Sequence, residues 1–173
     1  DTPLEAAPGE TGGVLADVAS SVLMKVLYGA RMARWDLLRA VGMLASRVTK
    51  WSHACDRALH RLMCYINTSK EHTLAGYVGQ NDYKSHHLGV YADSDLAGDR
   101  PGFKSTSGYF AAMMGDNMFF PFAAKSKTVA TVCNSTPEAE LVAAHTAIRT
   151  VGFPTLDVLD LLYGSPAWLM LYE

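Results

Sequence analysis

The stretch Tyr91-Ala-Asp-Ser-Asp-Leu-Ala-Gly98 decides the fold that this sequence predicts. Directly before and within this stretch, Leu88, Val90 and Ala92 alternate with Gly89, Tyr91 and Asp93. A period of two residues is typical of a β-strand. That strand ends in the carboxylate of Asp93. Further along, Asn134-Ser-Thr-Pro-Glu-Ala-Glu-Leu-Val-Ala-Ala144 has a capping-box pattern with an early proline, which predicts a helix with Glu140 in its opening turns.

An acid at a strand end that faces an acid on a helix is a good arrangement for holding a divalent metal. Mg²⁺ prefers hard oxygen ligands on rigid supports. We therefore take Asp93 and Glu140 as candidate metal ligands and catalytic residues for phosphodiester chemistry. Asp95 is predicted to be a turn or capping residue. Glu138 is predicted to cap the helix with Ser135, because helical positions two apart lie about 200° apart around the axis and cannot both face one site.

The rest of the chain changes period once. Residues 14–70 have apolar residues at helical spacing and predict a small helical layer after a loop-like leader, residues 1–13. Two later strands, at 109–114 and 118–124, predict a hairpin around Gly115-Asp-Asn117. Pro121 cannot donate a ladder hydrogen bond, so it is predicted to lie at an edge or a bulge.

The helix that begins after Ser135 is predicted to be interrupted at Gly152 and Pro154 and to resume over residues 156–162 until Gly164. Residues 168–172 then predict a strand. The predicted order is helices followed by β-β-β-α-α-β, an α/β fold.

Length and composition bound the class of protein. The 173 residues, 49% hydrophobic and 18% charged, correspond to one ordinary domain or a small domain with part of another. The sequence has no apolar run of about 20 residues for a membrane span and no signal peptide, and its start indicates a cut end of a longer polypeptide. Three cysteines without metal or disulfide spacing favour free thiols in a reducing compartment, hence an intracellular protein that is not secreted.

Charge is distributed unevenly. Residues 25–70 contain nine basic and two acidic side chains, a balance of 9 − 2 = +7, whereas the remainder is 6 − 15 = −9. A basic helical region beside an acidic region would suit a nucleic-acid track that leads to a metal site. A solvated helix face explains the same charges equally simply.

Three motifs in one order resemble the RNase H region of copia-type LTR retrotransposon Pol polyproteins. They are Tyr91 to Asp99, Lys104-Ser-Thr-Ser-Gly-Tyr109 and Ser135-Thr-Pro-Glu-Ala-Glu-Leu141. Upstream, Trp51 to Ile66 is similar to the helix that closes the reverse transcriptase region of that family, and Ala33 to Val41 is similar to the stretch before it. The resemblance covers about residues 14–173.

The resemblance implies a polyprotein segment with residues 14–70 from the end of the reverse transcriptase and residues 85–173 from a partial RNase H-like domain. The family has a mixed sheet with helices packed on it and cleaves RNA in RNA–DNA hybrids with Mg²⁺ or Mn²⁺, by a two-metal mechanism. Its implied partners are the hybrid and the remainder of the polyprotein, without a membrane. Its implied locations are the cytoplasm, a virus-like particle or the nucleus. Lower-ranked phosphate contacts are Lys104, Ser105 and Thr106, predicted in the loop between the first two strands, where a capping role explains them equally well. Lys125 and Lys127, predicted after the third strand, are further candidates for contact with the hybrid backbone.

The chain also departs from the family. A third acid is expected directly after the last strand, but residue 173 is a glutamate with the wrong strand parity to replace it, and the sheet is predicted to be C-terminally truncated. Leu96 stands where the family usually has Trp. We therefore expect the chain to be inactive alone. The alternatives are a decayed or repurposed, non-catalytic RNase H-like scaffold that binds nucleic acid, and a purely structural connector.

Overall fold

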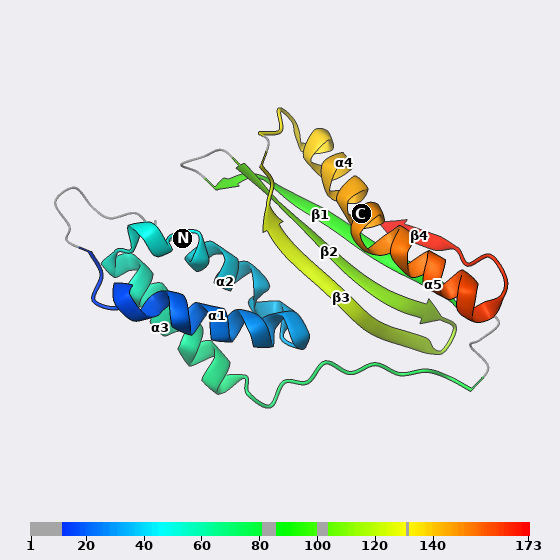
Figure 1. The fold of residues 1–173 in the computed structure, drawn as a ribbon, viewed down its shortest axis with the longest axis horizontal. Helices are drawn as coiled ribbons and strands as arrows, with labels where there is room; N and C mark the ends of the chain where they lie inside the picture. The colour runs from blue at the N-terminus through cyan, green and yellow to red at the C-terminus, as the bar shows by residue number, and fades with distance from the viewer. Residues whose placement is uncertain (1–11, 81–85, 100–103, 131) are drawn as a thin grey trace. The chain divides into compact units, whose positions relative to one another are not determined.

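The computed structural model describes residues 12–80, 86–99, 104–130 and 132–173 (Figure 1). The chain divides into two units, Asp1–Thr73 and Leu74–Glu173, and each is described here by itself. Most of the predicted leader, residues 1–11, lies outside the described residues. Within the described part, no helix is long and apolar enough to cross a membrane.

The first unit is helical, as the period of its apolar residues predicts. Its core contains Leu23, Val41 and Cys55, which are fully buried. The elements are α1 (Ala16–Met32), η1 (Trp35–Leu37), α2 (Leu38–Ala45), η2 (Val48–Lys50) and α3 (His53–Thr68).

Helix α1 begins without a side-chain cap of its own. The carboxylate of Asp56, on α3, takes that role: it accepts hydrogen bonds from the backbone N–H groups of Val14 at 2.8 Å and Leu15 at 3.1 Å. It also accepts one from the indole N–H of Trp51 at 2.7 Å. Gly13 approaches so closely that an added Cβ would lie 2.8 Å from the Asp56 oxygens. One side chain thus satisfies the exposed donors of a helix start that is distant in sequence.

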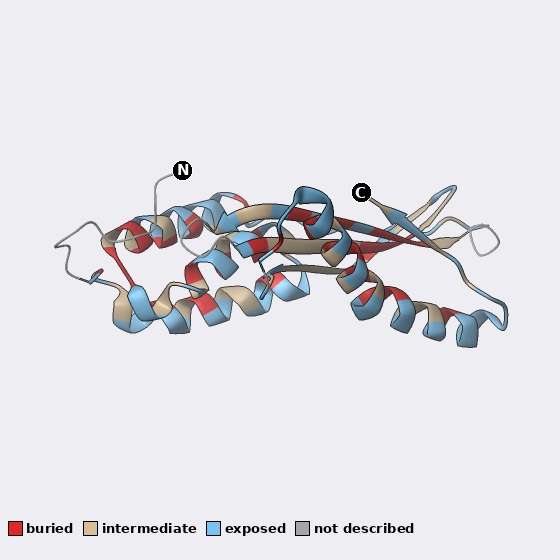
Figure 2. Cartoon of the chain, turned by 90° about the horizontal axis from the view of Figure 1, so that it is seen from above, coloured by how far each residue is buried: buried red, intermediate tan, exposed pale blue. Residues whose placement is uncertain are grey.

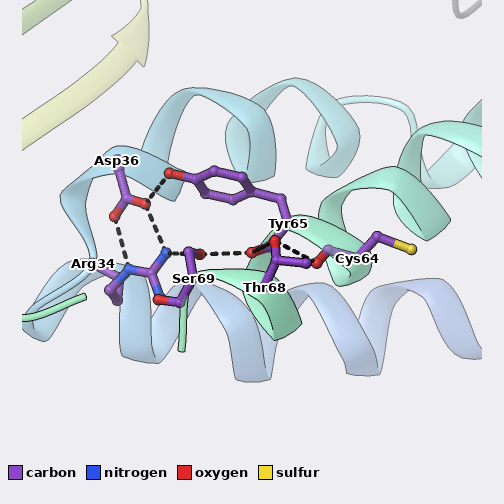
Figure 3. Close-up of polar contacts among 6 residues, drawn as sticks. All are labelled: Arg34, Asp36, Cys64, Tyr65, Thr68 and Ser69. Carbon is purple, nitrogen blue, oxygen red and sulfur yellow. Dashed lines mark hydrogen bonds and ion pairs between the residues drawn. The ribbon is translucent and has the colours of Figure 1, made fainter. Parts of the chain in front are cut away.

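A second polar cluster ties the end of α1 to the end of α3 (Figure 3). The guanidinium of Arg34 donates to both carboxylate oxygens of Asp36, at 3.0 and 2.8 Å, and to the carbonyl and hydroxyl oxygens of Ser69. The hydroxyl of Tyr65 donates to Asp36 at 3.0 Å. The Arg34 hydrogen bonds are the main reason that the pKa of the Asp36 carboxyl is lowered from its ordinary 3.8.

The second unit contains a four-stranded mixed sheet in the order β3-β2-β1-β4. Strands β1, β2 and β3 pair antiparallel, and β4 pairs parallel to β1. A helical connection joins β3 to β4, which parallel pairing requires. The bounds are β1 (His87–Asp99), β2 (Lys104–Gly115), β3 (Met118–Thr128) and β4 (Leu169–Tyr172). The predicted α/β class and the order β-β-β-α-α-β are confirmed.

The strands extend further than their patterns predict. Asp95 is not a turn residue, because it lies in β1 opposite Thr106 of β2. Lys104, Ser105 and Thr106 belong to β2 rather than to a loop. Lys125 and Lys127 lie within β3 rather than after it. Pairing with the neighbouring strand extends this far, although the register of β1 with β2 shifts between Asp95 and Asp99. The hydrogen bonds of this pairing outweigh the low strand propensity of Gly and Asp.

Pro121 lies where the sequence predicts. Strand β3 is an edge strand, and its register with β2 shifts between Ala111 and Ala112, beside Pro121. An edge with a bulge tolerates the missing donor of proline.

The α-helical pattern is interrupted close to the predicted place, Gly152 and Pro154, by a π-helical segment rather than by a loop. Helix α4 (Thr136–Ala147) passes through one π-helical segment, Ile148–Gly152, into α5 (Phe153–Tyr163). Pro154 falls in the first turn of α5, where a missing N–H group costs little. The π segment joins α4 to α5 without a loop between them. Gly164 ends α5 in the left-handed conformation (φ 64°), as predicted.

The core of the second unit lies between one face of the sheet and the helices (Figures 1 and 2). The strand residues Leu88, Val90 and Ala92 meet Ala143 and Ala147 of α4. Small alanines let α4 pack closely against the sheet. Burying such apolar surface contributes roughly 25 cal/mol per Å² to stability.

We predict that Asp56→Asn destabilises the first unit by about 1–3 kcal/mol, since the amide cannot accept the same set of hydrogen bonds. The loss of protection of the α1 amides should be visible by hydrogen exchange with mass spectrometry. Asp116→Asn, an exposed position in the second unit, is the matched control and should change nothing in α1. Unchanged α1 protection in Asp56→Asn would contradict the capping role.

The same carboxyl predicts a pH dependence. Desolvation alone raises the pKa of Asp56, but hydrogen bonds from Trp51 and from the backbone of Leu15 and Val14 outweigh it, so that the pKa falls below 3.8. As the pH falls, the unfolded chain binds a proton at Asp56 before the folded chain does. The stability that the charged carboxylate contributes is therefore complete well above pH 3.8 and is lost as the pH falls through the lower folded pKa. Urea denaturation between pH 5 and about pH 2 should show a shallower decline of stability in Asp56→Asn. If the stability of the parent chain and of Asp56→Asn declines in parallel, Asp56 is not a source of the pH dependence.

Candidate functional site

The register of the sheet gathers most of the predicted site residues at one end. Asp93 lies opposite Gly108, and Asp95 lies opposite Thr106. On the next strand Thr106 pairs with Thr128, and Ser107 pairs with Lys127. Helix α4 is the next element after β3, and it starts at the same end of the sheet (Figure 1).

The two faces of the sheet separate these residues. Val90 and Ala92 belong to the core that α4 covers. Side chains along a strand alternate, so Tyr91 and Asp93 lie on the opposite face, and both are exposed. Asp93 therefore points away from the helix that carries Glu140. The described geometry does not bring these two carboxylates onto one face, and their joint role as metal ligands remains a prediction.

Asp93 is held locally. Its carboxylate accepts a hydrogen bond from the backbone N–H of Ser94 at 2.8 Å. The neighbouring Ser94 is buried on the other face, near the carbonyl of Thr106. An exposed carboxylate with one backbone partner is a solvated charge that remains accessible to a cation or to a donor.

Glu140 occupies a different environment. It is half-buried and lies one turn before Ala143 and Ala144, so that it borders the stripe of α4 that faces the sheet. Glu138 is engaged at the helix start, where its carboxylate accepts from the N–H of Asn134 at 2.7 Å. Its own N–H donates to the Ser135 hydroxyl at 3.3 Å, as the capping pattern predicts.

The predicted phosphate contacts do not form one group. Ser105 is fully buried, and its hydroxyl accepts from the N–H of Ala97, a residue with φ 53°. Ser105 thus supports the irregular end of β1. Lys125 lies opposite Tyr109, which packs against the core, so its position belongs to the helix-covered face. Lys104 is exposed in β2, and Thr106 is half-buried.

The residues in the described ranges do not fit the divalent metal that the resemblance implies. No group of three or more His, Cys, Asp or Glu side chains converges there. Mg²⁺ binds tightly only where several oxygens replace its waters. Asp93 and Glu140 alone are two carboxylates, fewer than the several oxygens that tight Mg²⁺ binding needs.

A line of aromatic rings shares the face of Asp93. Its four rings come from four different strands, so no local sequence pattern predicts it. Tyr91 stacks on Tyr172 with ring centroids 4.5 Å apart. Tyr91 also meets Phe110 at 6.0 Å, and Phe110 meets Phe119 at 6.1 Å. These cross-strand pairs link all four strands and stabilise the register.

The exposed side of α3 carries two arginines. Arg57 and Arg61 are exposed and lie one helical turn apart. The two acids of this region, Asp36 and Asp56, are engaged in the internal contacts described above. The arginines of α3 are therefore exposed to solvent, whereas the two carboxylates accept hydrogen bonds from within the unit. The charge balance of +7 over residues 25–70 predicts that this region is basic. It does not predict which side of α3 carries the exposed arginines.

Comparisons of the chain with protein-family models, with curated proteins and with solved structures found no match.

We predict that neither Asp93→Asn nor Glu140→Gln alters binding of Mn²⁺, used as a spectroscopic substitute for Mg²⁺. Because the two carboxylates lie on opposite faces, no site tighter than about 1 mM is expected in the parent chain or either variant. Titration followed by electron paramagnetic resonance measures this directly. A tighter site that disappears in both variants would show that the two carboxylates share an ion.

Proposed function

We propose that the chain is a segment of a copia-type retrotransposon Pol polyprotein, joining the end of a reverse transcriptase to an RNase H-like domain. We further propose that this segment binds RNA–DNA hybrid and does not cleave it by itself. Hydrolysis of the RNA strand would belong to the parent protein, with acids beyond those that the described residues bring together.

The placement of three sequence motifs on the mixed sheet carries this proposal. Asp93 lies within the long central strand β1, the Lys104 motif begins β2, and Glu140 lies in the second turn of α4. The order β-β-β-α-α-β is the one that the resemblance implies. It supports the assignment because the motifs fall on the elements where that family would require them.

The charge of the first unit supports the binding part. Phosphate backbones attract Lys and Arg without reading sequence, and each contact releases counterions. Of the basic residues in 25–70, most are exposed: Lys25, Arg31, Arg39, Lys50, Arg57, Arg61 and Lys70. Hybrids are recognised mainly by shape and backbone, so this chemistry is sufficient for binding.

We predict salt-dependent binding of a fluorescein-labelled RNA–DNA hybrid without cleavage in Mg²⁺ or Mn²⁺. Replacing Arg57 and Arg61 by Gln should weaken binding and reduce the slope of log K against log salt by about 2, one unit for each lost phosphate contact. Fluorescence anisotropy measures binding, and a denaturing gel of the same samples reveals any RNA products.

The matched control is Arg149→Gln, which removes an exposed base from the second unit and should leave the slope unchanged. Binding that does not depend on salt, or no binding, would overturn the binding proposal. Metal-dependent RNA products would instead show that the chain assembles a catalytic site.

A further inference from the structure

Helix α5 exposes an unusual amount of apolar surface. Val158, Leu161 and Leu162 are 54%, 84% and 71% exposed. Their spacing places them on one side of the helix, which we call the α5 outer stripe. The buried residue of α5, Leu159, points into the core of the second unit. Apolar residues thus lie on both the inner and the outer side of this helix.

Such a helix is typical of one that is covered from both sides. Single exposed leucines are common, and Leu141 on α4, 67% exposed, is one of them. Val158, Leu161 and Leu162 lie on neighbouring turns and form a continuous strip. The strip would lose contact with water on docking, which gives a driving force for association.

The charge around the stripe selects the kind of partner. Helix α5 carries Asp157 and Asp160 and no lysine or arginine. Both acids are exposed. Asp160 accepts the N–H of Ala167 with one oxygen, at 2.6 Å. A partner with basic side chains beside its apolar residues would complement this surface, whereas a second copy would bring two acids against two acids.

We propose that the α5 outer stripe is a docking site for an amphipathic helix of a partner protein, with apolar residues in its centre and Lys or Arg on its flanks. Helices commonly recognise such partners through apolar residues at i, i+3, i+4 and i+7. Acids beside the stripe set the orientation and the choice of partner. This proposal concerns the second unit and does not depend on hybrid binding.

The test uses synthetic amphipathic peptides of about 18 residues, about five helical turns. One has Leu at the i, i+3, i+4 spacing with Lys flanks, and the other has Glu flanks. Isothermal titration calorimetry with the full chain should show binding of the Lys peptide and binding weaker by about tenfold or more for the Glu peptide. The double variant Leu161→Ser, Leu162→Ser should lose about tenfold or more in affinity for the Lys peptide.

Leu141→Ser is the matched control, since it removes an equally exposed leucine from α4 and should leave the affinity unchanged. Absence of binding, equal binding of both peptides or an equal loss in the control overturns the proposal. Light scattering that shows a dimer, dissolved by the double variant, assigns the stripe to a second copy instead. Co-sedimentation with phosphatidylcholine vesicles, lost in the double variant, assigns it to a membrane surface and also overturns the proposal.

Discussion

The alternation of side chains along β1 constrains everything that the second unit can do. Successive residues point to opposite faces, so the positions that build the core with α4 exclude their neighbours from it. Ala92 takes the core side, and Asp93 is therefore directed away from α4. A shift of one residue would reverse these directions, but it would also bury Tyr91 and Asp93 and expose Leu88 and Val90. The cost of burying an unpaired carboxylate prevents that exchange.

Two acids of the first unit are fixed by internal contacts in a comparable way. Asp56 caps a helix that lacks its own cap, and Asp36 fixes Arg34 beside Tyr65 and Ser69. Both carboxylates replace water by several hydrogen bonds, which favours their charged form and lowers both pKa values. The same contacts hold these two carboxylates within the helical unit, where they contribute to its stability.

Local patterns predict the elements of this fold well, because they act over a few residues. The period of Leu88, Val90 and Ala92, the turn at Gly115-Asp-Asn117 and the cap at Ser135 each depend on neighbours in sequence. The strand ends were less predictable. Residues 104–107 have turn-like composition, yet pairing with β1 keeps most of them in a ladder. Such pairing depends on residues far along the chain.

The candidate site was only partly predictable, because it too depends on residues that are distant in sequence. The sequence places Asp93 at a strand and Glu140 on a helix, and the register brings both to one end of the sheet. Which face each one occupies depends on which strand residues α4 covers, and that is decided by tertiary packing. Asp56 shows the converse: its contacts join residues 41 and 42 positions apart, and its sequence context suggests only a surface acid.

The net charge of −2 does not show how unevenly the charges are distributed, and that distribution governs binding. Charges are screened over about 8 Å at physiological ionic strength, so a partner responds to the side chains that it approaches and not to the total. Residues 25–70 present a local excess of +7, whereas α5 presents Asp157 and Asp160 beside its exposed leucines. A phosphate backbone is attracted by the first surface and repelled by the second, and a basic amphipathic helix has the opposite preference. The two surfaces therefore select partners of different chemistry, and binding at one does not require the other.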